Sequence, residues 1–263
     1  MKKIKIQCPA KINLDLRVSK KDEKTGFHNI KSIMQAISIY DYLTINLIPE
    51  NKIILSGTSN EIPYNEQNIC YRAARLFLDR NNLKTGCEIY IEKNIPVCAG
   101  LAGGSANGAG VVYGLNKLYG DILDYNELHK LVACLGSDLN FCLDGGTKLC
   151  YGRGEKIVMM PFYDFKLSII KPKNLKISSK EAYDAFDALD CESDMRNDLE
   201  FALLKTNKYP ELNYLHSLGL QMSGSGPVYF LRDKNIDFDV DLNKYIVIND
   251  LNSVKHGVRE IEL

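Results

Sequence analysis

Glycines gather in one stretch of the sequence, residues 95–120, which reads IPVCAGLAGGSANGAGVVYGLNKLYG. Gly100, Gly103 and Gly104 follow Pro96, and an apolar run at helical spacing comes after them. Glycine lets backbone N–H groups come close to an anion, and a helix N-terminus carries about half a positive charge. The stretch therefore predicts a phosphate-binding loop at a strand-to-helix junction, with a flexible loop as the alternative.

Two common phosphate-binding patterns are missing from the sequence. It contains no Gly-x-x-x-x-Gly-Lys-Ser/Thr run and no Gly-x-Gly-x-x-Gly fingerprint. The signatures of protein kinases are missing as well. If this stretch binds phosphate, it does so as a different kind of loop.

Cysteine and histidine spacing gives no support for a metal site. The eight cysteines are scattered without a Cys-x-x-Cys pair, and the four histidines lie far apart in sequence. Zinc sites usually draw on closely spaced ligands, and disulfide frameworks belong to short secreted chains. We therefore expect mostly buried thiols, no catalytic cysteine and no metal ligands that spacing alone identifies.

Composition indicates a globular protein with a small-molecule partner. The 263 residues are 45% hydrophobic and 25% charged, as in chains that bury a substantial core. Because 33 Lys and Arg balance 33 Asp and Glu, charge gives no reason to expect nucleic acid or a membrane surface as partner. No apolar run reaches about 18 residues, and the first residues lack the apolar core of a signal peptide. We expect a cytoplasmic protein.

Apolar patterns in the first half predict a sheet and two helices. Residues 66–82 place apolar side chains at helical spacing and end in asparagines. A second helix is expected near Asp124, where Glu127 completes a capping pair. Three runs alternate like strands, the last around an Asp-Tyr interruption: residues 4–8, 13–18 and 36–48.

In the second half, composition shifts across residues 152–165, where we expect a domain boundary. Residues 166–172 then read as a strand and residues 178–189 as a helix. Residues 220–231, LQMSGSGPVYFL, read as two strands joined by a Gly-Ser turn, because glycines permit backbone angles that other residues avoid.

The glycine-rich stretch resembles a known phosphate-binding loop. Residues 96–106, PVCAGLAGGSA, are similar to the Pro-x-x-x-Gly-Leu-x-x-Gly-Ser-Ser/Ala loop of the galactokinase, homoserine kinase, mevalonate kinase and phosphomevalonate kinase superfamily, which wraps the ATP phosphates. From about residue 6 to residue 230, further stretches resemble one of its families, the 4-diphosphocytidyl-2-C-methyl-D-erythritol kinases. They read CPAKINLDLRV (8–18), GFHNIKSIMQAISIYDYLTI (26–45), LGSDLNFCLDGGTKLCYGRGEKI (135–157), NDLE (197–200) and MSGSGP (222–227).

The sequence departs from the family pattern at a few positions. Asn140 stands where proline is usual, Ala106 where a second serine is frequent, and Phe27 where tyrosine is usual. The C-terminal part is somewhat short. None of these departures removes an expected catalytic side chain.

The resemblance implies an α+β fold, the two-domain small-molecule kinase fold. An N-terminal ribosomal-protein-S5-like α/β domain, residues 1–155, would bind ATP and carry the catalytic residues. A C-terminal ferredoxin-like α+β domain, residues 156–263, would bind the substrate. The implied reaction is ATP-dependent phosphorylation of the 2-hydroxyl of 4-diphosphocytidyl-2-C-methyl-D-erythritol, giving the 2-phosphate and ADP, in the non-mevalonate isoprenoid precursor pathway. The implied cofactors are ATP and Mg²⁺, and we expect a monomer or a weak homodimer.

Two charged residues match catalytic positions of the family. Asp138 matches the general base that accepts the proton of the substrate hydroxyl, and Lys11 matches the partner that offsets charge near the phosphoryl group. On local sequence alone, an aspartate after Gly-Ser is typical of a helix cap, and such a lysine is typical of a solvated edge strand. The apolar neighbours Ile12 and Leu14 argue against a solvated lysine.

Four residues match substrate-contacting positions. Asn13 is one, because a buried strand asparagine requires a hydrogen-bonding partner. Phe27, His28 and Tyr183 match positions that sandwich and hydrogen-bond the cytosine. On local sequence alone, His28 is typical of a surface histidine.

The remaining matched residues belong to the ATP site. Asn68 and Lys93 match positions near the adenine, with ordinary surface residues as the alternative. Ser105 is expected to help hold Mg²⁺ with the phosphates, and residues 224–226 to close the phosphate side, with a plain hairpin turn as the alternative. The matched loop residues are Pro96, Val97, Cys98, Ala99, Gly100, Leu101, Ala102, Gly103, Gly104, Ser105, Ala106 and Asn107.

Two other functions stay open on the sequence. Another kinase of the same superfamily, acting on mevalonate derivatives or homoserine, would have a similar loop but would leave residues 26–28 without a cytosine to bind. A non-enzymatic nucleotide-binding regulator would keep the loop and lose the chemistry. The presence of both Lys11 and Asp138 argues against that regulator.

Overall fold

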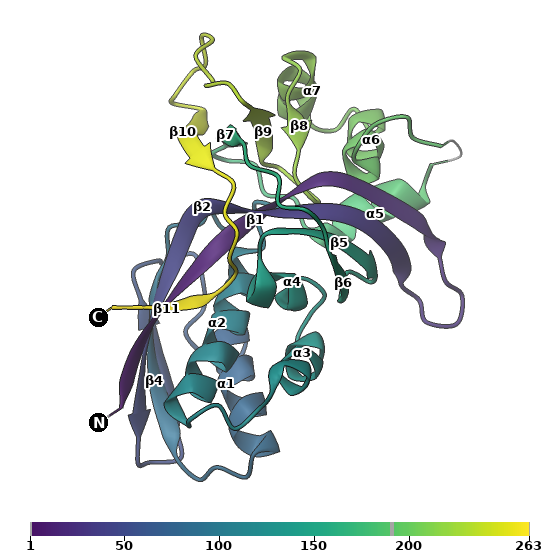
Figure 1. Ribbon diagram of the computed structural model, residues 1–263. Helices are drawn as coiled ribbons and strands as arrows, with labels where there is room; N and C mark the ends of the chain where they lie inside the picture. Colours follow the sequence, from purple (N-terminus) through teal and green to yellow (C-terminus); the bar gives the residue numbers. More distant parts are fainter. Residues whose placement is uncertain (1, 190–191, 263) are drawn as a thin grey trace.

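Two sheets with associated helices make up the structure (Figure 1). The computed structural model describes residues 2–189 and 192–262, and within them the strands form one seven-stranded and one four-stranded sheet. The mixture of helices with largely antiparallel sheets confirms the predicted α+β class.

The seven-stranded sheet is built around two long antiparallel strands, β1 (Lys3–Lys21) and β2 (His28–Ile48). Eight consecutive residues of β1, Ile6 to Asn13, are buried, so both faces of this strand are covered along its centre. The sheet order is β11-β1-β2-β4-β3, and β5 also pairs with β2 and carries β6. These other strands are β3 (Ile53–Gly57), β4 (Gly86–Glu92), β5 (Thr147–Gly152), β6 (Lys156–Met159) and β11 (Arg259–Ile261).

The two strands expected at residues 4–8 and 13–18 are one continuous strand. Pro9, which has no N–H to donate to a ladder, lies at a register shift between β1 and β2, so the pairing continues on either side of it. The expected interruption of residues 36–48 is likewise wrong, because Asp41 and Tyr42 pair with Cys8 and Gln7 inside β2. The continuous β1 places Lys11 and Asn13 near its middle.

Both helices predicted in the first half of the chain are confirmed. The helix expected at residues 66–82 is α1 (Ile69–Arg80), and α3 (Tyr125–Ala133) starts with the predicted Asp124–Glu127 capping box. The helix after the glycine-rich loop is α2 (Gly103–Leu118), and a short α4 (Leu139–Asp144) follows α3. Glycines inside α2 allow close packing: a Cβ atom on Gly110 would lie 2.5 Å from Cys8 Sγ.

The four-stranded sheet is antiparallel, with the order β10-β7-β9-β8. The predicted strand, helix and hairpin of this half are confirmed as β7 (Lys166–Pro172), α5 (Ser179–Asp187), β8 (Gln221–Met222) and β9 (Tyr229–Arg232). The remaining elements are α6 (Asp198–Lys205), α7 (Pro210–Ser217) and β10 (Tyr245–Asn252).

The chain leaves the seven-stranded sheet after β6 and enters the four-stranded sheet with β7. The β5–β6 hairpin spans the predicted boundary after residue 155 and belongs wholly to the first sheet. The four-stranded sheet begins with β7, and the chain then returns to the first sheet through β11, which pairs with β1. The division into domains at residue 155 stays a prediction.

A buried cluster joins the two sheets beneath the glycine-rich loop. It includes Ile12 of β1, Leu101 of the loop and Phe230 of β9. Residues from both halves of the chain therefore pack against the loop. This packing argues against the alternative that the glycine-rich stretch is only a flexible loop.

Most described cysteines are buried, as predicted. Burial raises the pKa of Cys70, Cys87 and Cys150 to about 12, so these thiols stay protonated at neutral pH. Cys98 and Cys134 are exposed, and Cys191 lies outside the described residues. No helix in the described part of the chain is both long and apolar enough to cross a membrane.

Candidate active site

A cavity of about 630 Å³ lies where the glycine-rich loop meets β1, α4 and the β8–β9 turn. Of the predicted site residues, Ala106, Phe27 and His28 do not line it. The predicted residues that do are Lys11, Asn13, Asn68, Lys93, Pro96, Val97, Cys98, Ala99, Gly100, Leu101, Ala102, Gly103, Gly104, Ser105, Asn107, Asp138 and Tyr183. Residues 127 positions apart in sequence, Lys11 and Asp138, thus share one cavity.

Lys11 and Asp138 form the charged pair of this cavity. Lys11 Nζ lies 3.9 Å from Asp138 Oδ2 and donates hydrogen bonds to Asn13 Oδ1 at 2.6 Å and to the Gly100 carbonyl at 3.0 Å. The Lys11 side chain is only 5% exposed, so the solvated alternative is excluded. Asn13 in turn donates from Nδ2 to Ser32 Oγ at 2.8 Å. The ammonium is therefore held by fixed acceptors while facing a carboxylate.

Asp138 occupies the N-cap position of α4 without acting as a cap. Its backbone has helical angles, and its side chain makes no capping hydrogen bond. The carboxylate is 28% exposed and lines the cavity, so it can accept a proton from a bound molecule. The cap interpretation, which local sequence favoured, does not account for this side chain.

The glycine-rich loop leads into a helix N-terminus that has no side-chain cap. The residue before α2, Ala102, has a left-handed backbone with φ of 54° and no capping side chain. The first amides of α2 therefore keep their hydrogen-bonding capacity for an anion, as a phosphate site requires. Gly103, Gly104 and Ser105, the first residues of the helix, line the cavity.

Gly100 marks the closest contact between this loop and the turn after β8. Its φ is +73°, and a Cβ atom there would lie 2.2 Å from the Ser223 carbonyl oxygen. Gly100→Ala is expected to lower kcat/KM for the ATP-dependent reaction that the resemblance implies by about 10- to 100-fold, because the loop must shift away from the Ser223 carbonyl.

Gly120 provides a matched control for that substitution. It also has a left-handed backbone, with φ of +84°, but a Cβ atom there would meet nothing within 4 Å. Gly120→Ala should cost about 1–2 kcal/mol of stability from backbone strain while leaving kcat/KM unchanged. Equal kinetic losses in the two variants would show that the Gly100–Ser223 contact does not matter for activity.

A fully buried carboxylate, Asp41, ties both ends of the loop to β2. It accepts hydrogen bonds from the Asn94 and Ile95 amides at 2.7 and 2.8 Å, from Lys93 Nζ at 2.6 Å and from Asn107 Nδ2 at 3.0 Å. Sequence reasoning missed this residue. An aspartate in the middle of an apolar strand pattern was the available signal, because a buried charge requires partners.

Asn68 is buried and the Lys93 side chain is only 5% exposed, so neither is an ordinary surface residue. Asn68 caps α1 by accepting from the Cys70 amide at 2.9 Å and donates to the Pro63 carbonyl at 2.6 Å. Lys93 Nζ is held by Asp41 and by the Ile95 carbonyl. Both side chains line the cavity with their polar groups already engaged.

Of the three aromatic residues predicted for cytosine, only Tyr183 lines the cavity, and His28 packs on it. The His28 ring stacks on Tyr183 with a centroid distance of 5.0 Å, and its Nε2 lies 3.3 Å from Asp187 Oδ1. The His28 side chain is 8% exposed, so the surface alternative is wrong. Burial, with a smaller contribution from the charge of Asp138, raises the pKa of Tyr183 to about 12, which leaves its hydroxyl a neutral donor.

Arg153 links the main cavity to Phe27. Its guanidinium lies 5.2 Å from the centre of the Phe27 ring, which is 55% exposed. Arg153 lines the main cavity and a smaller one next to Phe27. No carboxylate in residues 2–189 and 192–262 forms an ion pair with it. Sequence reasoning gave Arg153 no role, although it belongs to the quoted Gly-Arg-Gly-Glu run.

The turn after β8 faces the charged pair from the other side. Ser223 donates to the Gly100 carbonyl at 3.1 Å, and a Cβ atom on Gly224 would lie 3.3 Å from Lys11 Nζ. Gly224, Ser225 and Gly226 line the cavity. The turn is thus both a hairpin connection and a wall of the site.

Protein ligands for a metal are sparse. Among the described residues, no group of three His, Cys, Asp or Glu side chains is arranged to hold an ion. Ser105, at the start of α2, offers a hydroxyl to the cavity. Such a donor set suits a Mg²⁺ ion that is held mainly by phosphate oxygens and water, as Mg²⁺ often is in phosphate-transfer sites.

Comparisons with known proteins agree on one family. Residues 68–146 match the GHMP kinases N terminal domain. A 4-diphosphocytidyl-2-C-methyl-D-erythritol kinase from Caldicellulosiruptor saccharolyticus is 35% identical, with 98% of this chain and 95% of the relative covered. One from Clostridium botulinum (strain Alaska E43 / Type E3) is 39% identical, with 86% and 89% covered.

Solved structures share the fold of this chain. A crystal structure of 4-(cytidine 5'-diphospho)-2C-methyl-D-erythritol kinase superposes with a TM-score of 0.71 at 29% identity, covering 86% of this chain and 89% of the other. Homoserine kinase from Cytophaga hutchinsonii superposes with a TM-score of 0.70 at 18% identity, covering 99% and 98%, and supports the fold alone.

Proposed function

The chain belongs to the family of 4-diphosphocytidyl-2-C-methyl-D-erythritol kinases, and we propose that it uses ATP to phosphorylate the 2-hydroxyl of 4-diphosphocytidyl-2-C-methyl-D-erythritol. The products are the 2-phosphate and ADP, in the non-mevalonate isoprenoid precursor pathway. The observation that carries the proposal is the Lys11–Asp138 pair, 3.9 Å apart, in a cavity walled by the glycine-rich loop.

The charged pair is assigned the proton and charge chemistry. ATP, when bound, supplies the γ-phosphoryl group. Asp138 accepts the proton of the substrate hydroxyl as its oxygen attacks, because its carboxylate faces the cavity without a capping bond. Lys11 offsets the negative charge that develops beside it, and Asn13 and the Gly100 carbonyl fix the position of its ammonium.

The phosphates of ATP are assigned to the loop and the start of α2. Uncapped amides and nearby glycines suit a polyanion. We assign Mg²⁺ to those phosphates with the Ser105 hydroxyl as a protein donor. Asn68 and Lys93 would shape the adenine end chiefly as parts of the wall, since their polar groups are already bonded.

The cytidine diphosphate group is assigned to the opposite end. Tyr183 presents an aromatic ring to the cavity, and Phe27 and His28 lie beside it. Arg153 supplies a guanidinium without an ion-pair partner among the described residues, which suits a diphosphate. A cytoplasmic location and a monomeric or weakly dimeric state stay predictions.

A coupled ADP-release assay against a panel of alcohols tests this function. We expect turnover with 4-diphosphocytidyl-2-C-methyl-D-erythritol and none above background with mevalonate or homoserine, because those two substrates have no base for the aromatic residues Phe27, His28 and Tyr183 to pack against. Comparable kcat/KM with mevalonate would move the chain to another branch of the superfamily. ATP binding without ADP release for any alcohol would support a regulator.

A further inference from the structure

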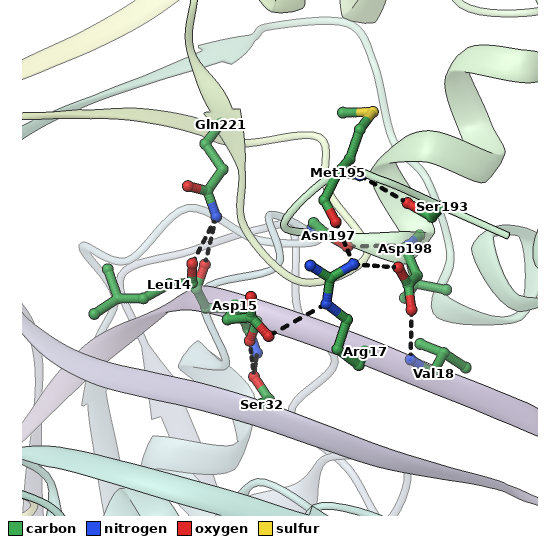
Figure 2. Close-up of polar contacts among 12 residues, drawn as sticks. Leu14, Asp15, Arg17, Val18, Ser32, Ser193, Met195, Asn197, Asp198 and Gln221 are labelled. Carbon is green, nitrogen blue, oxygen red and sulfur yellow. Dashed lines mark hydrogen bonds and ion pairs between the residues drawn. The ribbon is translucent and has the colours of Figure 1, made fainter.

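Strand β1, which carries Lys11, is hydrogen-bonded to the second half of the chain through residues 16–18. The Leu16 amide donates to the Arg196 carbonyl at 2.8 Å, and the Val18 amide donates to Asp198 Oδ2 at 2.8 Å. Figure 2 shows this region, with Arg17 reaching from β1 to Asp198 and to the Met195 carbonyl. Residues 195–198 thus form a fixed edge beside β1.

Asn197 extends this edge to the turn that walls the site. Its side chain is fully buried, and Nδ2 donates to two carbonyls of the turn, those of Met222 and Gly224, both at 2.9 Å. Its Oδ1 accepts from the Leu199 amide at 3.0 Å and from the Glu200 amide at 3.3 Å and so caps α6. One buried amide group therefore holds a helix start and a turn together, with all its hydrogen-bonding capacity used.

Glu200 and Gln221 also help to hold the turn at residues 222–226. Glu200, on the first turn of α6, accepts from the Met222 amide at 3.0 Å. Gln221 donates to the Leu14 carbonyl of β1 at 2.9 Å (Figure 2). Residues 197–200, the Asn-Asp-Leu-Glu run, thereby hold both the N–H and the C=O of Met222.

The held turn lies against Asn13 and against Lys11 of the charged pair. Ser223 Oγ accepts from the Asn13 amide at 3.3 Å and donates to the Gly100 carbonyl, which also accepts from Lys11 Nζ. A Cβ atom on Gly224 would lie 3.1 Å from Asn13 Oδ1 and 3.3 Å from Lys11 Nζ. A shift of residues 222–226 by a fraction of an ångström would therefore change the position of the Lys11 ammonium.

We propose that Asn197 is a positioning residue for phosphoryl transfer: by holding the Met222 and Gly224 carbonyls it fixes the turn at residues 222–226 against Gly100 and Lys11. The role rests on the proposed kinase function. Asn197 does not touch the cavity; it acts through the turn.

Asn197→Asp isolates this role. An aspartate still caps α6 through its oxygen, but it cannot donate to either carbonyl, and it places oxygen against oxygen. We expect kcat to fall about 10- to 100-fold, as for small misplacements of reacting groups, while KM for the cytidine substrate changes less than about threefold.

Asn116→Asp is the matched control. Asn116 is also buried, near the C-terminal end of α2, and it does not line the cavity. It accepts from the Leu123 amide at 2.9 Å and donates to the Leu123 carbonyl at 3.0 Å. The same chemical change there should lower Tm to a comparable degree and leave kcat within twofold. Hydrogen–deuterium exchange should rise at residues 220–228 in Asn197→Asp and at residues 119–125 in Asn116→Asp.

The outcomes separate the two proposals. A loss of kcat confined to Asn197→Asp, with faster exchange at residues 220–228, supports the positioning role. Equal losses of kcat in both variants, or unchanged exchange at that turn, overturn it. If the unmodified protein does not phosphorylate the cytidine substrate, the proposed function fails, and the exchange data still report whether Asn197 holds the turn. Should Asn197→Asp not fold, Asn197→Ser keeps a cap without a buried charge, and the same criteria apply.

Discussion

Asp138→Asn is expected to lower the turnover number by about 10²- to 10⁴-fold, the range for positioned acid–base groups. The amide keeps the shape of the side chain and removes the proton acceptor that lies 3.9 Å from Lys11. Binding of ATP and of the cytidine substrate should change by less than about 1.4 kcal/mol, or tenfold, because the loop and the aromatic end hold them. Steady-state kinetics and calorimetry measure the two effects separately.

Asp124→Asn makes the same chemical change at another N-cap position. Asp124 does cap its helix, by accepting from the Glu127 amide at 2.8 Å, and asparagine caps about as well as aspartate. Its kcat should therefore match that of the unmodified protein. If Asp138→Asn also stays within threefold of the unmodified turnover, Asp138 is neither the base nor the group that orients the alcohol.

Features set by neighbouring residues are predictable from this sequence. The capping box at Asp124, the helix at residues 178–189 and the β8–β9 hairpin each depend on residues within a few positions of one another. The glycine-rich loop is also local, since a strand end, glycines and a helix start suffice to define it. The resemblance to the kinase family then predicted that Lys11 and Asp138 belong to one site, and both residues line the cavity.

Contacts between distant segments are what the sequence leaves undetermined. Asp41 looks like an interruption of a strand because its partners Lys93 and Asn107 lie 52 and 66 positions away. Asn197 looks like a helix cap, and nothing near it indicates the carbonyls 25 and 27 positions later. Alternation and spacing report which face is apolar, but they do not report which buried polar groups meet.

The aromatic end shows the same limit for side-chain placement. The sequence puts Phe27 and His28 next to each other, yet the structure packs His28 on Tyr183 and leaves Phe27 exposed beside Arg153. Phe27 precedes β2 and His28 is its first residue, so alternation along the strand does not determine where the Phe27 side chain lies.

Asp41→Asn is expected to lower the free energy of unfolding by about 3–5 kcal/mol, the cost of breaking a buried ion pair by removing one partner. Asp41 is fully buried and the Lys93 side chain is 5% exposed, so the ammonium would stay in the interior without a counter-charge. Each carboxylate oxygen of Asp41 also accepts from two donors. Whichever way an asparagine amide is turned, its NH₂ group meets two donors. Urea denaturation measures the loss.

Asp79→Asn is the matched control, because it removes the carboxylate of an exposed ion pair instead of a buried one. Asp79 pairs with Arg75 at 3.4 Å on the surface of α1, with its side chain 63% exposed, and exposed pairs contribute at most about 1 kcal/mol. Replacing Lys93 by methionine in the Asp41→Asn background should recover part of the stability, because it removes the unpaired charge. A loss below about 1 kcal/mol in Asp41→Asn, equal to that in Asp79→Asn, would mean that the buried pair does not hold the loop in place.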